Sequence, residues 1–172
     1  MIDMETAATS SDAAVLQFAA YQFYGMGTGA EFNSYISPDS NTDYKRKFDP
    51  QTLAWWDKQD RDLRNKVFSG TSYLDNTISN FNAGLTGIPK ENIYLWSNGA
   101  DFDLMILKDI YEESLGWKYP FDFRNHRCFR TLKSLWPGEP PKFEGQKHDA
   151  LCDARHQGQW AVKILKNLGV IE

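Results

Sequence analysis

The sequence of 172 residues has few cysteines, no long apolar run and no excess of basic residues. Its two cysteines, Cys128 and Cys152, cannot form a disulfide framework, so we expect reduced thiols. No stretch approaches the roughly 18 apolar residues that cross a bilayer, which excludes a membrane-spanning helix. The N-terminal stretch MIDMETAATSSD has neither the basic residues nor the apolar segment of a signal peptide, so a cytoplasmic location is expected.

The charge balance leaves a nucleic-acid partner open. There are 19 Lys and Arg residues against 23 Asp and Glu residues, and an acidic chain attracts phosphates poorly through its overall field. If four of the acids were gathered around metal ions, however, the remaining charges would balance. The hydrophobic content of 41% and the length are those of one folded domain, which we expect to span residues 1–172.

Local patterns predict the order of strands and helices. Apolar or alternating stretches predict strands over residues 1–6, 13–24, 31–37, 92–97 and 127–131. Between the second and third strands, the turn of a hairpin is predicted by Gly25, Gly27 and Gly29. Helical spacing of apolar residues predicts helices over 50–59, 60–68, 74–85, 101–115 and 149–168. This order predicts an α/β fold with a mixed five-stranded sheet flanked by helices.

Some helix ends carry more detailed signals. Asp49 followed by Pro50 is typical of an N-cap and the first helical residue. Ser72, with Asp75 three residues on, resembles a capping box for the helix that follows. In the last helix, the apolar spacing predicts that Leu168 faces the core.

Asp3 and Glu5 lie two residues apart on the first predicted strand, so both side chains point to the same face of the sheet. Two carboxylates on one face repel each other unless a cation lies between them, and such hard oxygen ligands favour Mg²⁺ or Mn²⁺. The alternative is a solvated strand end, because an Asp-x-Glu pattern often arises by chance.

Three further residues fit the same chemistry. Asp103 follows a predicted strand in the first turn of a helix, although acids are common there and Asp101 is a competing cap. His148 and Asp153 lie at the start of the last helix, and His148 alone of the three histidines has an Asp five residues on. A lone histidine is usually a surface or core residue. The occurrence of all these motifs in this order favours a shared site instead.

The segments MIDMET, NGADFD and HDALCD resemble the three motifs of the DEDDh 3′–5′ exonucleases. The resemblance covers nearly the whole chain, because the motifs lie near both ends and the elements between them follow the family's order. It implies a ribonuclease-H-like fold. The segment TLAWWDKQ and the small size are most similar to phage and bacterial exonucleases such as exonuclease A of tailed phages, which implies a bacterial or phage-infected cell.

The resemblance also implies a set of site residues. Two Mg²⁺ or Mn²⁺ ions would be bound by Asp3, Glu5, Asp103 and Asp153, one generating the attacking hydroxide and the other stabilising the leaving 3′-oxygen. His148 would be the general base, because an imidazole can accept a proton near neutral pH.

Substrate contacts follow from the resemblance and from helix geometry. The family implies that Met4 and Thr6 line the pocket for the terminal nucleotide, Met4 as an apolar wedge and Thr6 through its backbone. Trp55 and Trp56 would point about 100° apart on a helix, so one can be core while the other stacks on a base. We assign Trp56 to the substrate, together with Lys147 beside the histidine.

The resemblance implies a metal-dependent 3′–5′ exonuclease that releases nucleoside monophosphates from a single-stranded nucleic acid with a free 3′ end. The phage-like resemblance favours DNA over RNA. Members of the family occur both as dimers and as monomers, so a homodimer is left open. Two alternatives are a catalytically silent nucleic-acid or protein-binding module of the same fold and a structure-specific endonuclease. The complete set of acids argues against the first, and the offset of His148 from Asp153 argues against the second.

Overall fold

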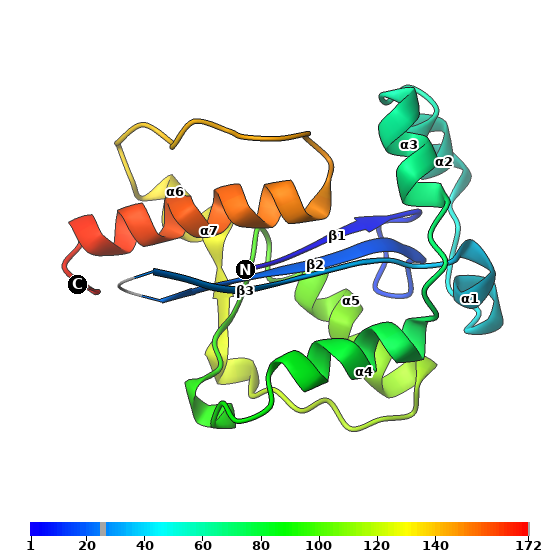
Figure 1. The fold of residues 1–172 in the computed structure, drawn as a ribbon, viewed down its shortest axis with the longest axis horizontal. Helices are drawn as coiled ribbons and strands as arrows, with labels where there is room; N and C mark the ends of the chain where they lie inside the picture. The colour runs from blue at the N-terminus through cyan, green and yellow to red at the C-terminus, as the bar shows by residue number, and fades with distance from the viewer. Residues whose placement is uncertain (25–26, 172) are drawn as a thin grey trace.

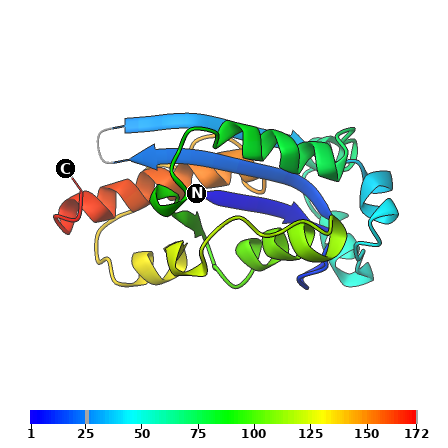
Figure 2. The same ribbon diagram turned by 90° about the horizontal axis from the view of Figure 1, so that it is seen from below.

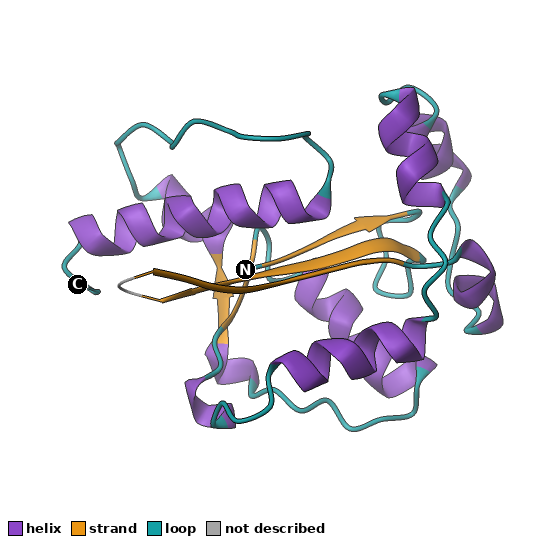
Figure 3. Cartoon of the chain, viewed as in Figure 1, coloured by secondary structure: helices purple, strands orange, loops and turns teal. Residues whose placement is uncertain are grey.

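A computed structural model describes residues 1–24 and 27–171, and within them it has one mixed five-stranded sheet (Figures 1 and 3). The order of strands is β3-β2-β1-β4-β5, with bounds β1 Ile2–Thr6, β2 Val15–Tyr24, β3 Gly27–Tyr35, β4 Leu95–Ser97 and β5 His126–Cys128. The first three strands are antiparallel, whereas β4 runs parallel to β1 and β5 runs parallel to β4. The predicted sheet is confirmed, and Gly25 lies outside the described residues.

Helices cover both faces and one end of this sheet (Figures 1 and 2). The long α7 lies on one face, and α4 and α5 lie on the other, while α1, α2 and α3 gather at the end of the sheet where β1 finishes. Their bounds are α1 Pro38–Asp43, α2 Pro50–Trp56, α3 Arg61–Phe68, α4 Leu74–Gly84, α5 Asp103–Asp109, α6 Phe129–Ser134 and α7 Ala150–Asn167. Shorter helical turns occupy Lys90–Asn92, Ile110–Ser114 and Phe123–Asn125. Among the described residues, no helix is long and apolar enough to cross a membrane.

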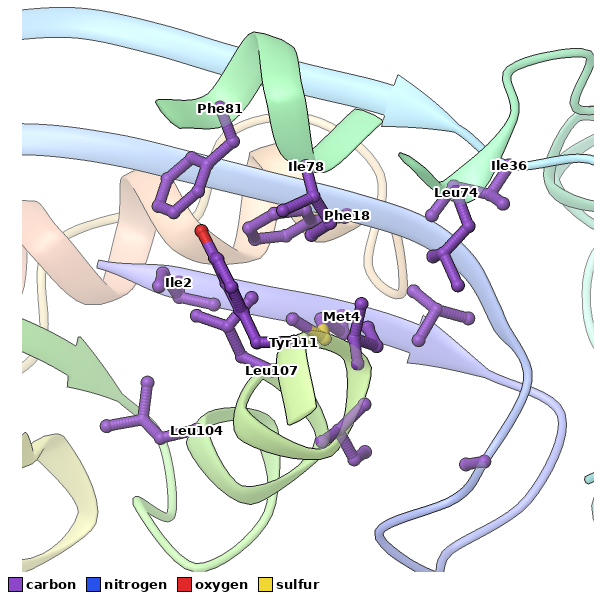
Figure 4. Close-up of a cluster of buried hydrophobic side chains, with 14 of the residues drawn as sticks. Ile2, Met4, Phe18, Ile36, Leu74, Ile78, Phe81, Leu104, Leu107 and Tyr111 are labelled. Atoms are coloured by element: carbon purple, nitrogen blue, oxygen red, sulfur yellow. The ribbon is translucent and has the colours of Figure 1, made fainter. Parts of the chain in front are cut away.

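The central strand β1 divides its side chains between the two faces of the sheet. Ile2 and Met4 point into the main hydrophobic cluster, where they pack with residues of α4 and α5 such as Ile78 and Leu107 (Figure 4). Full burial of an aliphatic side chain of this size stabilises a fold by about 1.5–3 kcal/mol. Because alternate residues of a strand face opposite sides, the other side chains of β1 project from the face that α7 covers.

One of the two predicted helix caps is confirmed. Asp49 caps α2 by accepting a hydrogen bond from the amide of Thr52 at 2.9 Å. The capping box of Ser72 is wrong, because the carbonyl of Ser72 accepts from the amide of Ser37, and the bridge between Ile36 and Ser72 keeps this segment extended. The α4 helix begins only at Leu74. Its first amide donates instead to a side chain distant in sequence, Oγ of Ser40, at 2.9 Å.

Several element boundaries also differ from the prediction. The strand β3 includes Gly29, where a Cβ atom would lie only 2.4 Å from Oε1 of Gln22, so this glycine admits the Gln22 side chain rather than forming the turn. The last strand ends at Cys128, and Phe129 begins α6 because its ring is buried against α7. Leu168 lies beyond the end of α7 and is exposed rather than inward.

Candidate active site

Three carboxylates from opposite ends of the chain meet on the face of the sheet that α7 covers. Asp3 and Glu5 project from β1, and Asp153 projects from the first turn of α7. One oxygen from each carboxylate lies within 4.8 Å of the others. Asp3 and Asp153 are half-buried and Glu5 is buried, so these like charges are held close together in a poorly hydrated place.

Asp103 joins this group from the edge of β1. The short strand β4 pairs with β1 only at Ile2 and Ser97, so the rest of this edge is left without a strand partner. Oδ1 of Asp103, the first residue of α5, accepts a hydrogen bond from the amide of Met4 at 3.1 Å. Its carboxylate is therefore fixed against the strand that carries Asp3.

All four acids have raised pKa values, because of burial and, for Asp3 and Glu5, also because of the neighbouring negative charges. Burial, followed by the nearby charges of Asp103 and Asp153, raises the pKa of Asp3 well above its usual range. Burial and then Asp3 do the same to the pKa of Glu5, and burial raises that of Asp153. Burial also raises the pKa of Asp103 to about 7, although hydrogen bonds from backbone amides oppose it. A cluster of this kind favours a bound cation, and its oxygen donors are those that Mg²⁺ and Mn²⁺ prefer.

His148 lies two residues before the first helical residue of α7 and is exposed. Its backbone has a φ of 63°, in the left-handed region, and its amide donates to Oδ2 of Asp153 at 2.8 Å. The imidazole ring meets the ring of Trp55 edge-on, with 5.1 Å between their centroids. His148 is therefore attached to the acidic cluster through its backbone, while its side chain faces solvent beside a tryptophan.

The structure corrects two of the predicted substrate contacts. The Met4 side chain is buried in the core between β1 and α5, on the face away from the acids, so it cannot form a wedge in a nucleotide pocket. Trp56 is 1% exposed, and its indole N–H donates to the carbonyl of Thr6 at 2.9 Å. Its neighbour Trp55 is 40% exposed and is the tryptophan that contacts His148.

The other two predicted contacts are placed as follows. Thr6 is buried at the end of β1, with its hydroxyl donating to the carbonyl of Ala8 at 2.7 Å. Lys147 is exposed next to His148. A contact of either residue with substrate stays a prediction.

Sequence reasoning missed three polar residues around the site. Gln157 donates from Nε2 to Oδ1 of Asp3 at 2.8 Å, and its position one helical turn after Asp153 was a signal that could have identified it. Arg130 is exposed and donates from Nη2 to the carbonyl of Asn98, in the loop before Asp103. Lys66 on α3 reaches the start of α7. No local pattern singles out Arg130 or Lys66, because their contacts depend on how distant segments pack.

Comparison with known proteins agrees with this geometry. Over residues 1–165 the sequence matches the family described as the Rv2179c-like 3′–5′ exoribonuclease domain. The fold is similar to the crystal structure of cell-death related nuclease 4 (CRN-4), with a TM-score of 0.57 and 15% sequence identity. That match covers 98% of this chain and 63% of the nuclease, so the chain spans less than two thirds of the length of its structural relative. No protein with a curated description matches the sequence.

These matches decide several of the expectations from sequence. The ribonuclease-H-like fold is confirmed. The closer likeness to exonuclease A of tailed phages stays a prediction, and the preference for DNA finds no support in a family described by its action on RNA. The chain belongs to the Rv2179c-like 3′–5′ exoribonuclease domain family.

Proposed function

We propose that the protein releases nucleoside monophosphates one at a time from the free 3′ end of single-stranded RNA. The observation that carries this proposal is the meeting of Asp3, Glu5 and Asp153 within 4.8 Å, with His148 held beside them through Asp153. The choice of RNA over DNA rests on the description of the family to which the chain belongs.

The acidic cluster fits a pair of divalent cations. Its members offer oxygen donors alone, and burial raises the pKa of each of them, with repulsion from the neighbouring acids adding to the rise for Asp3 and Glu5. The ligands of two Mg²⁺ or Mn²⁺ ions would be Asp3, Glu5, Asp103 and Asp153. When bound, such ions supply charge stabilisation to a phosphodiester under attack and lower the pKa of water.

The remaining residues of the site orient the substrate and move a proton. His148 accepts the proton of the attacking water through its exposed imidazole, whose edge contact with Trp55 limits its rotation. Gln157 holds Oδ1 of Asp3 in place. The open face of Trp55 is suited to stack on the terminal base, a contact that tolerates any base and therefore gives no sequence specificity.

The geometry favours a terminal nucleotide of a single strand. The exposed indole of Trp55 lies next to His148, so a base stacked there must be free of its own stacking partners. A duplex end would have to fray first, at a cost of a few kcal/mol. Arg130 adds an exposed positive charge beside the loop that precedes Asp103, where the next phosphate of a strand can lie.

The test uses RNA and DNA strands of one sequence, labelled at the 5′ end and either free or phosphorylated at the 3′ end. We expect a descending ladder from the free RNA strand with Mg²⁺ or Mn²⁺, protection of the blocked strand, slower cleavage of DNA, and no products with EDTA. Asp3→Ala should abolish the activity. Equal cleavage of the blocked strand would refute the proposal, as would full activity in EDTA or with Asp3→Ala.

A further inference from the structure

A second carboxylate network lies beside the acidic cluster and uses none of its members. Asp149, between His148 and α7, is 4% exposed. Its Oδ2 accepts hydrogen bonds from Nζ of Lys66 at 2.8 Å and from the hydroxyl of Tyr35 at 2.9 Å. Its Oδ1 accepts from the amides of Leu151 and Cys152 at 3.2 Å each, so the same side chain caps α7. Asp149 thereby joins β3, α3 and α7 at one point.

Asp149 differs from the metal-binding acids because protein groups already satisfy its charge. Burial alone would raise its pKa, but the hydrogen bonds from Lys66 and Tyr35 outweigh burial and lower the pKa to about 2. The ammonium group of Lys66 also lies 5.0 Å from the centroid of the Tyr35 ring. Both carboxylate oxygens of Asp149 are occupied, which identifies this residue as an anchor rather than a further metal ligand.

The anchor adjoins the residue whose placement matters most to the proposed chemistry. His148 has a left-handed backbone, which a residue with a Cβ atom adopts only where its surroundings hold it. Its amide is bound by Asp153, its ring contacts Trp55 of α2, and the next residue in the chain is fixed by Lys66 of α3. The consecutive helices α2 and α3 therefore flank the histidine and its anchor.

We propose that Lys66 is a positioning residue for the general base: by holding Asp149 it fixes the start of α7 and the direction in which the His148 imidazole points. This inference rests on the proposed function. Among the contacts of the described residues, Lys66 touches neither the four proposed metal ligands nor the His148 imidazole, so it acts through Asp149. Its side chain is 54% exposed, which makes it replaceable without opening the core.

The test compares Lys66→Met with Lys66→Arg and with a matched control on the same helix, Arg64→Met. Arg64 forms an ion pair with Asp57 at 2.8 Å, so its replacement removes an equivalent surface charge pair away from α7. For Lys66→Met we expect kcat on single-stranded RNA to fall about tenfold, which corresponds to about 1.4 kcal/mol. KM should change by less than about twofold, and calorimetric affinity for Mn²⁺ should be unchanged, since no ligand is touched. Lys66→Arg should recover most of kcat and Arg64→Met should retain it.

Amide hydrogen exchange, measured on the protein without RNA or metal, gives a readout that does not depend on catalytic activity. In Lys66→Met, amides in the segment 144–153 should exchange about tenfold faster, while those of 157–165 later in α7 keep the wild-type rate. Unchanged exchange in 144–153 of Lys66→Met overturns the inference. So does a kcat of Lys66→Met equal to that of an active wild-type protein. A rise in KM at constant kcat also overturns it, because it assigns Lys66 to RNA phosphate binding. Wild-type protein that releases no nucleotide overturns the proposed function, whereas the exchange data still decide whether Lys66 anchors this segment.

Discussion

Replacing Asp103 by Asn should stabilise the metal-free protein by an amount that depends on pH. Asp103 is 4% exposed, and burial raises its pKa from the model-compound value of 3.8 to about 7. Because the pKa is higher in the folded state, the ionised carboxylate costs stability that grows as the pH rises through this range and is complete above it. At about 1.36 kcal/mol for each pKa unit, the cost at about pH 8 is about 4 kcal/mol.

The substitution Asp103→Asn removes the charge and keeps an oxygen that can accept the hydrogen bond from the amide of Met4. Urea denaturation in EDTA should show the variant more stable than wild type by about 4 kcal/mol at about pH 8, and by less than about 2 kcal/mol at about pH 5. Asp101→Asn, an exposed acid two residues earlier, controls for the loss of one negative charge. Saturating Mn²⁺ should then stabilise wild type more than Asp103→Asn, because the variant lacks a ligand.

Two results would refute this reasoning. If the difference in stability between wild type and Asp103→Asn were the same at both pH values, the carboxylate would not be held protonated by burial. If Asp101→Asn gave the same pH-dependent gain, the effect would come from the net charge of the chain rather than from the site.

Three further predictions concern His148 and the two neighbouring tryptophans. His148→Ala should lower kcat by about 10²–10⁴-fold and leave Mn²⁺ affinity near wild type, as expected for a lost general base, and calorimetry beside single-turnover kinetics checks this; loss of metal binding would make His148 a ligand or a support. Trp55→Ala should weaken binding of single-stranded RNA by about 1–3 kcal/mol with little change in stability, because its ring is exposed. Trp56→Ala should instead destabilise the fold by about 3–5 kcal/mol, because it empties a buried site and removes the hydrogen bond to Thr6. Equal effects of the two tryptophan substitutions on RNA binding per folded molecule would contradict these roles.

The sequence predicted the acidic residues of β1 well because their placement depends on a local rule. A strand alternates its faces, so Asp3 and Glu5 had to share one side as soon as the strand was recognised. The predicted start of α7 likewise placed Asp153 in the same short segment as His148, five residues after it. Which strand neighbours which, and therefore that these acids meet across the chain, came from resemblance rather than from local pattern.

Contacts made by distant segments could not be predicted in this way. The helix rule gave Trp55 and Trp56 different directions, but only the packing of α2 against β1 decides which ring is buried. The cap of α4 comes from Ser40, more than thirty residues from Leu74, and no nearby residue signals it. Lys66 is one of many lysines until the fold brings it to the start of α7.

The error over Met4 is more instructive, because the same periodicity that placed the acids excludes it from the site. If Asp3 and Glu5 face α7, the residue between them must face α5, and there it contributes to the core. Only its backbone amide reaches the site, through the hydrogen bond to Asp103. The apolar contact that the resemblance assigns to Met4 must therefore come from another residue, and the exposed ring of Trp55 beside His148 is a contact that the structure offers for the terminal base.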